Sequence, residues 1–132
     1  MSEENVETVE RAITAINERD IDGYLACCTE DIQLKTPVSP VAGVYEGADG
    51  IRRFFADIED AGPDFRLHPE RLEAVGGERV LAFVRLTFHG RASGLSIPAE
   101  NGNVYEFEEG KIRRVQIFFD RGEALEAAGL SE

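Results

Sequence analysis

Two polar side chains fall on strand faces that are otherwise apolar. Thr36 alternates with Ile32 and Leu34 along one predicted strand, and Asn103 alternates with Tyr105 along another. Because successive side chains of a strand point to opposite faces, Thr36 and Asn103 share the face that points into the core. A few polar groups in apolar surroundings are typical of a small-molecule site. We therefore expect Thr36 and Asn103 to orient a ligand.

Both residues also have a purely structural interpretation. Thr36 could bond to the backbone at the end of its strand, and Asn103 could cap a turn at Asn101-Gly102. Further ligand contacts are expected from aromatic walls and one glutamine, namely Phe54, Phe55, Tyr105, Phe118 and Gln116.

Few titratable side chains are placed for catalysis. Asp120 follows the last predicted strand and is the best carboxylate near a mouth of the site, although it could instead cap the helix beyond it. The adjacent Cys27 and Cys28 are interpreted as reduced, partly buried thiols, with a nucleophilic thiol as the alternative. His68 is expected on the surface and His89 at an interface or in solvent, so we predict no metal site, and we expect no cofactor.

Length and charge restrict the class of protein. The chain has 132 residues, which predicts one domain over residues 1–132. Its net charge of -12 disfavours nucleic acid and anionic membranes as partners. No apolar run approaches the roughly 18 residues of a membrane span, and the acidic N-terminal residues are unlike a targeting signal. We therefore expect a cytoplasmic protein.

Helical periodicity marks three segments in the first half of the chain. Asp20 is expected to cap the second helix and Asp49 the third, which Gly62-Pro63 ends. A short terminal helix is predicted over residues 123–128, ending at Gly129.

Period-two alternation marks the strands, one of which precedes the third helix. Turns are expected at Gly76-Gly77, Ser93-Gly94 and Asn101-Gly102, and an interruption at His68-Pro69. The strands are predicted over residues 31–36, 65–75, 80–89, 95–97, 104–108 and 112–120. Helices followed by an antiparallel meander indicate an α+β fold with helices on one face of a curved sheet.

The longest predicted strand has two unlike faces. One is wholly apolar and is expected in the core: Val80, Ala82, Val84, Leu86 and Phe88. The other mixes apolar and polar side chains, which is typical of an interface between protein copies: Leu81, Phe83, Arg85, Thr87 and His89. We expect a homodimer through the face that bears Phe83, Arg85, Thr87 and His89.

The order of these elements resembles that of the nuclear-transport-factor-2-like superfamily, and within it the SnoaL-like and ketosteroid-isomerase-like group. The likeness runs from about residue 6 to residue 129 and rests on several short stretches. They are Ala15-Ile16-Asn17-Glu18-Arg19-Asp20, Glu30-Asp31-Ile32, Gly47-Ala48-Asp49-Gly50-Ile51 and Phe107-Glu108-Glu109-Gly110-Lys111-Ile112, with Asp120 and Gly129 near the end. The resemblance implies a cone-shaped, curved antiparallel sheet with three N-terminal helices packed on its concave face, a cystatin-like roll, in a single SnoaL-like domain that encloses a pocket.

The catalytic residues that the resemblance would imply are absent from this chain. Thr36, just before a proline, stands where the isomerases carry their carboxylate base, and Ile117 stands where the cyclases carry an aspartate. Ala12 replaces the tyrosine of the oxyanion hole, and Asn103 replaces its protonated acid. Neither mechanism can be copied onto this sequence, so catalysis is left open.

Three functions remain open from the sequence. The first is a protein that binds a small apolar or mildly polar organic molecule. The second is a cofactor-independent isomerase, cyclase or dehydratase for a polyketide-like or steroid-like substrate, with Asp120 or Tyr24 as its base. The third is a dimeric interaction module with no functional pocket.

Overall fold

The computed structural model describes residues 2–36, 44–61, 64–87 and 100–130. His89, Phe88 and the strand predicted over residues 95–97 lie outside these ranges. In chain order the elements are α1 (Ser2–Glu18), α2 (Ile21–Ala26), β1 (Cys28–Lys35), β2 (Val44–Glu46), α3 (Gly47–Ala61), β3 (Arg66–Val75), β4 (Arg79–Thr87), β5 (Glu100–Glu108), β6 (Lys111–Phe118) and α4 (Arg121–Ala128).

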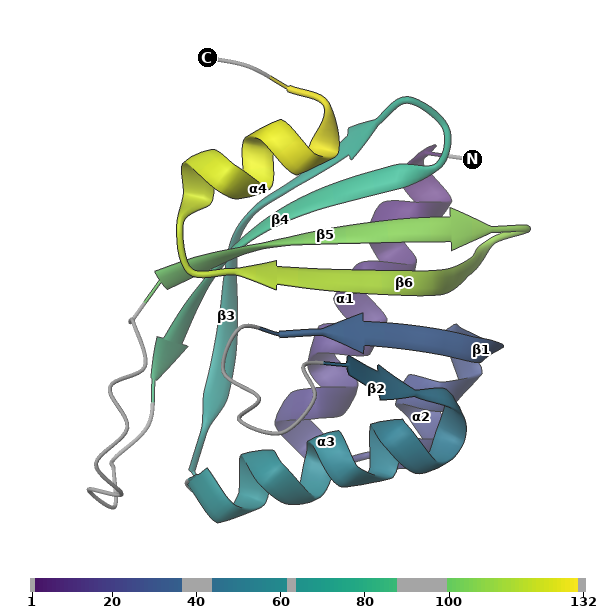
Figure 1. Cartoon of the computed structure of the whole chain (residues 1–132), viewed down its shortest axis with the longest axis vertical. Helices are drawn as coiled ribbons and strands as arrows, with labels where there is room; N and C mark the ends of the chain where they lie inside the picture. The colour runs from purple at the N-terminus through teal and green to yellow at the C-terminus, as the bar shows by residue number, and fades with distance from the viewer. Residues whose placement is uncertain (1, 37–43, 62–63, 88–99, 131–132) are drawn as a thin grey trace.

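The strands form one six-stranded sheet in the order β2-β1-β6-β5-β4-β3 (Figure 1). All neighbours pair antiparallel except β1 and β6, which run parallel. This parallel pair departs from the expected all-antiparallel sheet. Because most of the chain separates β1 from β6, no tight hairpin forces them to run in opposite directions.

Helices cover both faces of the curved sheet (Figure 1). On the inner face, α1 packs on β3 and β4, α3 packs on β1 and β2, and α2 lies against both helices. On the outer face, α4 packs on β4, β5 and β6. The α+β fold with three N-terminal helices on a curved sheet is thus confirmed. In the described ranges, no helix combines the length and the apolar character needed to cross a membrane.

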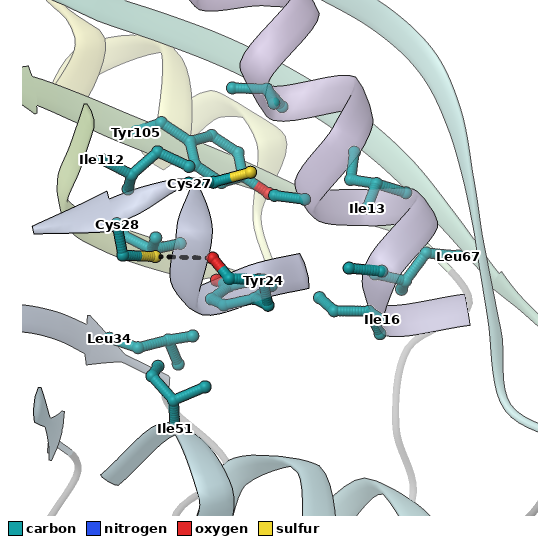
Figure 2. Close-up of a cluster of buried hydrophobic side chains, with 14 of the residues drawn as sticks. Ile13, Ile16, Tyr24, Cys27, Cys28, Leu34, Ile51, Leu67, Tyr105 and Ile112 are labelled. Atoms are coloured by element: carbon teal, nitrogen blue, oxygen red, sulfur yellow. Dashed lines mark hydrogen bonds between the residues drawn. The ribbon is translucent and has the colours of Figure 1, made fainter. Parts of the chain in front are cut away.

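The main core lies between the inner face of the sheet and helices α1 to α3 (Figure 2). The apolar face expected along β4 belongs to it, and its largest fully buried members include Tyr24, Ile32, Leu34, Ile51 and Ile112. A second, smaller core lies under α4 on the outer face and contains Leu81, Val104, Ala124, Leu125 and Ala128.

Two of the predicted helix ends are confirmed, and Gly62-Pro63, predicted to end the third helix, lies outside the described ranges. The Asp20 carboxylate caps α2 by accepting a hydrogen bond from the Gly23 amide, and α4 ends at Gly129 in the left-handed conformation. The prediction for Asp49 was wrong, because α3 already begins at Gly47. Asp49 lies instead in the first turn, where its negative charge still favours the positive end of the helix dipole.

The predicted turn at Asn101-Gly102 was also wrong. Both residues lie inside β5, where Asn101 pairs with Val84 and Gly102 pairs with both Phe83 and Phe118. The close packing of α4 on Gly102 explains why a glycine lies in the middle of a strand. A Cβ added at this position would lie only 2.6 Å from the Cβ of Ala124 in α4. The interruption predicted near Pro69 is confirmed as a shift of register in β3.

Candidate functional site

Thr36 and Asn103 lie in one row across the inner face of the sheet. Asn103 pairs with Ile117, and the parallel register of Lys35 with Gln116 brings Thr36, the next residue, alongside Ile117. Thr36 is 8% exposed and Asn103 is 5% exposed. Ile117 stands between them and packs against the main core, yet it is only half-buried. The row therefore combines two buried polar side chains with an apolar side chain, that of Ile117, which is partly exposed.

Asn101 extends this polar row toward the start of β5. It lies two residues before Asn103, so both asparagines point to the inner face, and Asn101 is 7% exposed. The Oδ1 atoms of both are buried and have no hydrogen-bond partner within the part of the chain that the structure describes. Sequence reasoning missed Asn101 because it assigned that residue to a turn, although the alternation with Asn103 and Tyr105 could have revealed it.

Tyr105 and Tyr24 place two phenol groups deeper in the same interior (Figure 2). Burial raises the pKa of Tyr105 to about 12, against an opposing effect of its hydrogen bond with Asn103. Burial also raises the pKa of Tyr24 well above its ordinary value, and the neighbouring Cys28 adds to the effect. Both hydroxyls therefore stay protonated at neutral pH, which makes Tyr24 unfit as a general base there.

The two cysteines are free, as the sequence led us to expect, and they are buried rather than partly buried. Burial raises the pKa of Cys28 to about 12, and its Sγ donates to the carbonyl oxygen of Tyr24 at 3.3 Å. Because the thiolate is the nucleophilic form, this thiol is not activated. The Sγ of Cys27 donates to the Gly23 carbonyl at 3.5 Å.

Two of the expected aromatic walls lie on α3. Phe55 is buried, and its ring meets that of Tyr24 edge to face at 5.6 Å between centroids. Phe54 is half-buried, and its ring contacts those of Phe55 and Tyr45. These rings belong to the main core on the same inner side as Thr36 and Asn103.

Gln116 and Phe118 lie on the opposite face of the sheet from that row. They alternate with Val115 and Ile117 along β6, and Phe118 packs into the small core under α4. The structure therefore does not bring these two residues together with Thr36 and Asn103.

Asp120 is an exposed residue that caps α4. Its Oδ1 accepts a hydrogen bond from the Gly122 amide at 2.7 Å, which confirms the capping alternative. The catalytic role suggested for Asp120 stays a prediction that its position in the fold does not favour.

Apart from tyrosine phenols and cysteine thiols, the buried polar side chains among the described residues carry no ionisable group. They are Asn5, Thr8, Thr36, Asn101 and Asn103. Across the same ranges, no three His, Cys, Asp or Glu side chains lie close enough together to hold a metal ion. The inner face thus offers hydroxyl and amide groups rather than a carboxylate or imidazole base.

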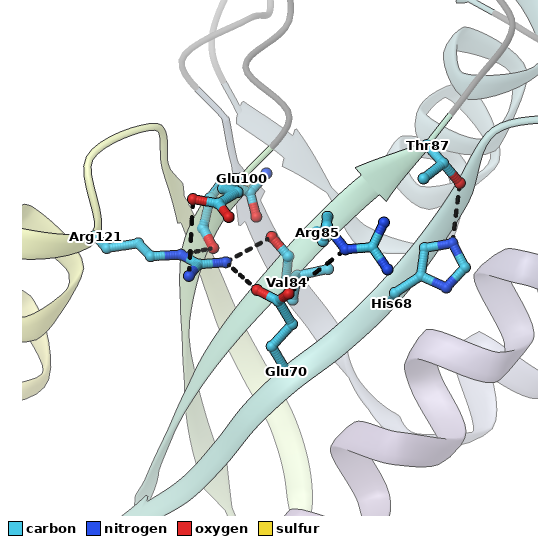
Figure 3. A network of polar contacts seen from close by, with 8 residues as sticks. His68, Glu70, Val84, Arg85, Thr87, Glu100 and Arg121 are labelled. Atoms are coloured by element: carbon cyan, nitrogen blue, oxygen red, sulfur yellow. Dashed lines mark hydrogen bonds and ion pairs between the residues drawn. The ribbon is translucent and has the colours of Figure 1, made fainter.

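The outer face of β3 and β4 carries a polar network (Figure 3). Glu70 pairs with Arg121 at 2.8 Å and with Arg85 at 3.5 Å, and its hydrogen bond with Arg121 lowers its pKa. His68 was expected on the surface but is half-buried, with its Nε2 2.9 Å from the hydroxyl of Thr87.

Phe83 on this face is half-buried against the core under α4. The guanidinium of Arg121 lies 4.7 Å from its ring centroid, and that of Arg71 lies 5.3 Å away. The part of the proposed dimer face nearest Phe83 is therefore occupied by the chain's own side chains.

Comparisons with known proteins agree with this architecture. An uncharacterized cystatin-fold protein from Novosphingobium aromaticivorans is 29% identical, with a TM-score of 0.73 over 89% of this chain and 98% of that one. Bal32a, from a soil-derived mobile gene cassette, is 25% identical, with a TM-score of 0.75 over 91% of this chain and 92% of the other. An NTF2-like protein of unknown function from Burkholderia pseudomallei is also 25% identical, with a TM-score of 0.72 over 93% and 95% of the two chains.

More distant structures share the fold alone. They include a protein described as a polyketide cyclase from Sinorhizobium meliloti, 20% identical with a TM-score of 0.67 over 84% of this chain and 93% of that one. No curated protein matches the chain. A sequence model of the SnoaL-like domain matches residues 9–115, which is most of the chain. This protein therefore belongs to the SnoaL-like domain family.

Proposed function

We propose that this protein binds a compact, largely apolar organic molecule on the inner face of its sheet. The observation that carries the proposal is the row of Thr36, Ile117 and Asn103, in which two buried polar groups flank an incompletely covered apolar side chain. Polar groups of this kind fix the orientation of a ligand, while the surrounding apolar side chains supply most of the contact area. Phe54 and Phe55 are the walls we propose on the side of α3.

Binding is a better proposal than acid–base catalysis. An isomerase, cyclase or dehydratase needs a group that takes a proton near neutral pH. In the described ranges the buried polar side chains hold no carboxylate and no imidazole. The distant likeness to a protein described as a polyketide cyclase supports the fold, and it does not supply the missing base.

A ligand that binds the native state is expected to raise the melting temperature. A probe at ten times its Kd stabilises by about 1.4 kcal/mol, which corresponds to a rise of about 5 °C for a domain of this size. The measurement is differential scanning calorimetry with 2-naphthol and 2-methoxynaphthalene as probes. The variant Ile117→Trp should lose the shift, because the indole would fill the space beside Thr36 and Asn103.

The matched control is Gln116→Trp, which places the same indole one residue away on the opposite face of the sheet. This variant should keep the shift seen with the unmodified protein. Equal losses in both variants, or no shift with either probe, would count against the proposed site.

We propose in addition that the protein forms a homodimer through the outer face that bears Arg85 and Thr87. Arg85 is exposed there and forms an ion pair with Glu70. Arg85→Glu would place a second carboxylate beside Glu70 on this face, and the added negative charge should weaken the dimer. Light scattering coupled to size exclusion should then show a shift from dimer toward monomer. A wild-type protein that is monomeric at high micromolar concentration would overturn this proposal.

A further inference from the structure

The two inner asparagines of β5 leave hydrogen-bond acceptors without donors. The Oδ1 atoms of Asn101 and Asn103 are buried and unpartnered among the described residues. The great majority of buried polar atoms in folded proteins are hydrogen-bonded, and leaving one unpaired costs about 1–3 kcal/mol. Two such atoms on one face of one strand therefore call for a common explanation.

The chemistry of the free atoms can be assigned for Asn103. Asn103 forms a hydrogen bond with Tyr105, and because the Oδ1 atom of Asn103 has no partner within the described ranges, its amide nitrogen is the donor in that contact. The amide oxygen of Asn103 is then the atom left over. A carbonyl oxygen can only accept, so the partner that completes it must donate.

The surroundings of the two oxygens restrict the donor further. Asn101 and Asn103 are neighbours on one strand face, where side chains stand about 6.6–7 Å apart. The β4 residues paired with them, Val84 and Ala82, are apolar and fully buried. Because the buried side chains of the described residues include no carboxylate, an ammonium group would find no counter-charge. Neutral hydroxyl groups fit both acceptors.

We propose that the ligand of this protein presents two hydroxyl donors on one edge, which bind the side-chain oxygens of Asn101 and Asn103. The inference rests on the proposed ligand site and adds the substrate class, a dihydroxylated compact ring. In the steroid isomerases, the group that corresponds to Asn103 would donate a hydrogen bond to a carbonyl oxygen of the ligand. In the present proposal, Asn103 instead accepts a hydrogen bond from the ligand. A ligand that offers only carbonyl or ether oxygens would face the two acceptors with acceptors of its own.

Calorimetric titration with 1,3-dihydroxynaphthalene and 1,3-dimethoxynaphthalene tests the inference. The two probes share a ring system, but only the first can donate. We expect the diol to bind at least tenfold more tightly to the unmodified protein. The double variant Asn101→Leu with Asn103→Leu should bring the two affinities within about twofold, whereas Gln116→Leu, on the outer face, should keep the preference.

The possible results separate the two proposals. Equal affinity for both probes in the unmodified protein would overturn the inference and leave the binding function standing. A preference for the diol that survives the double variant would also overturn the inference. Binding of neither probe would overturn both proposals. If the double variant does not fold, the single variant Asn101→Leu replaces it. A tenfold ratio between the affinities for the two probes should then fall to about threefold or less.

Discussion

Between pH 8 and pH 11 the free energy of unfolding is expected to fall by on the order of 5 kcal/mol. Burial raises the pKa of Cys28 and of Tyr105 to about 12, and it raises that of Tyr24 well above its ordinary value. In the unfolded chain these groups lose their protons near the ordinary values of 9.0 for the thiol and 10.0 for the phenols. Above those values, each of these groups lowers the free energy of unfolding by about 1.4 kcal/mol for every further pH unit.

The sign of this effect follows from which state keeps its protons. From pH 9 upward the folded protein binds more protons than the unfolded chain, so stability is complete below pH 9 and declines above it. Since domains of this kind are stable by only about 5–15 kcal/mol, we expect much of the stability to be gone by pH 11.

Denaturant unfolding at half-unit steps from pH 8 to pH 11, with a reductant present, measures the profile. Cys28→Ala should remove most of the loss of stability between pH 9 and pH 10, because of these three groups only the thiol loses its proton there in the unfolded chain. Tyr105→Phe should reduce the slope above pH 10 and leave the lower part unchanged. A wild-type profile that stays level to pH 11 would show that these groups titrate as freely in the folded protein as in the unfolded one.

Features that depend on a few neighbouring residues could be predicted from the sequence. The cap at Asp20, the left-handed Gly129 and the register shift near Pro69 each follow from local chemistry, and the structure has all three. Thr36 and Asn103 were placed on the inner face by strand alternation alone, because period two is a property of the backbone.

Features that depend on distant contacts could not be predicted. Asn-Gly is a strong hairpin signal, yet Asn101-Gly102 lies within β5, because α4 packs on Gly102 from 22 residues further along the chain. The same helix covers the outer face and gives Phe118 an apolar environment there. Alternation along β6 showed that Phe118 and Ile117 face opposite ways, but only the placement of α4 shows which side each occupies.

Replacing Gly102 by valine is expected to lower the free energy of unfolding by about 3 kcal/mol or more. A Cβ at this position would lie 2.6 Å from the Cβ of Ala124 and 3.4 Å from the ring of Phe83. The backbone cannot retreat, since Gly102 is paired with strands on both sides. Helix α4 must therefore move away from the sheet and expose part of the small core that contains Leu81 and Val104. Denaturant unfolding at pH 7 measures the loss.

A compensating pair of variants attributes this loss to the contact itself. Gly102→Ala should cost about 1–3 kcal/mol, and Ala124→Gly should cost about 1 kcal/mol as a helix substitution. The double variant should be more stable than the sum of the two losses predicts, because removing the Ala124 methyl makes room for the new one. Gly77→Ala is the control, since a Cβ there would meet nothing within 4 Å. Strict additivity of the two losses would mean that α4 does not press on Gly102, and the glycine in mid-strand would then need another cause.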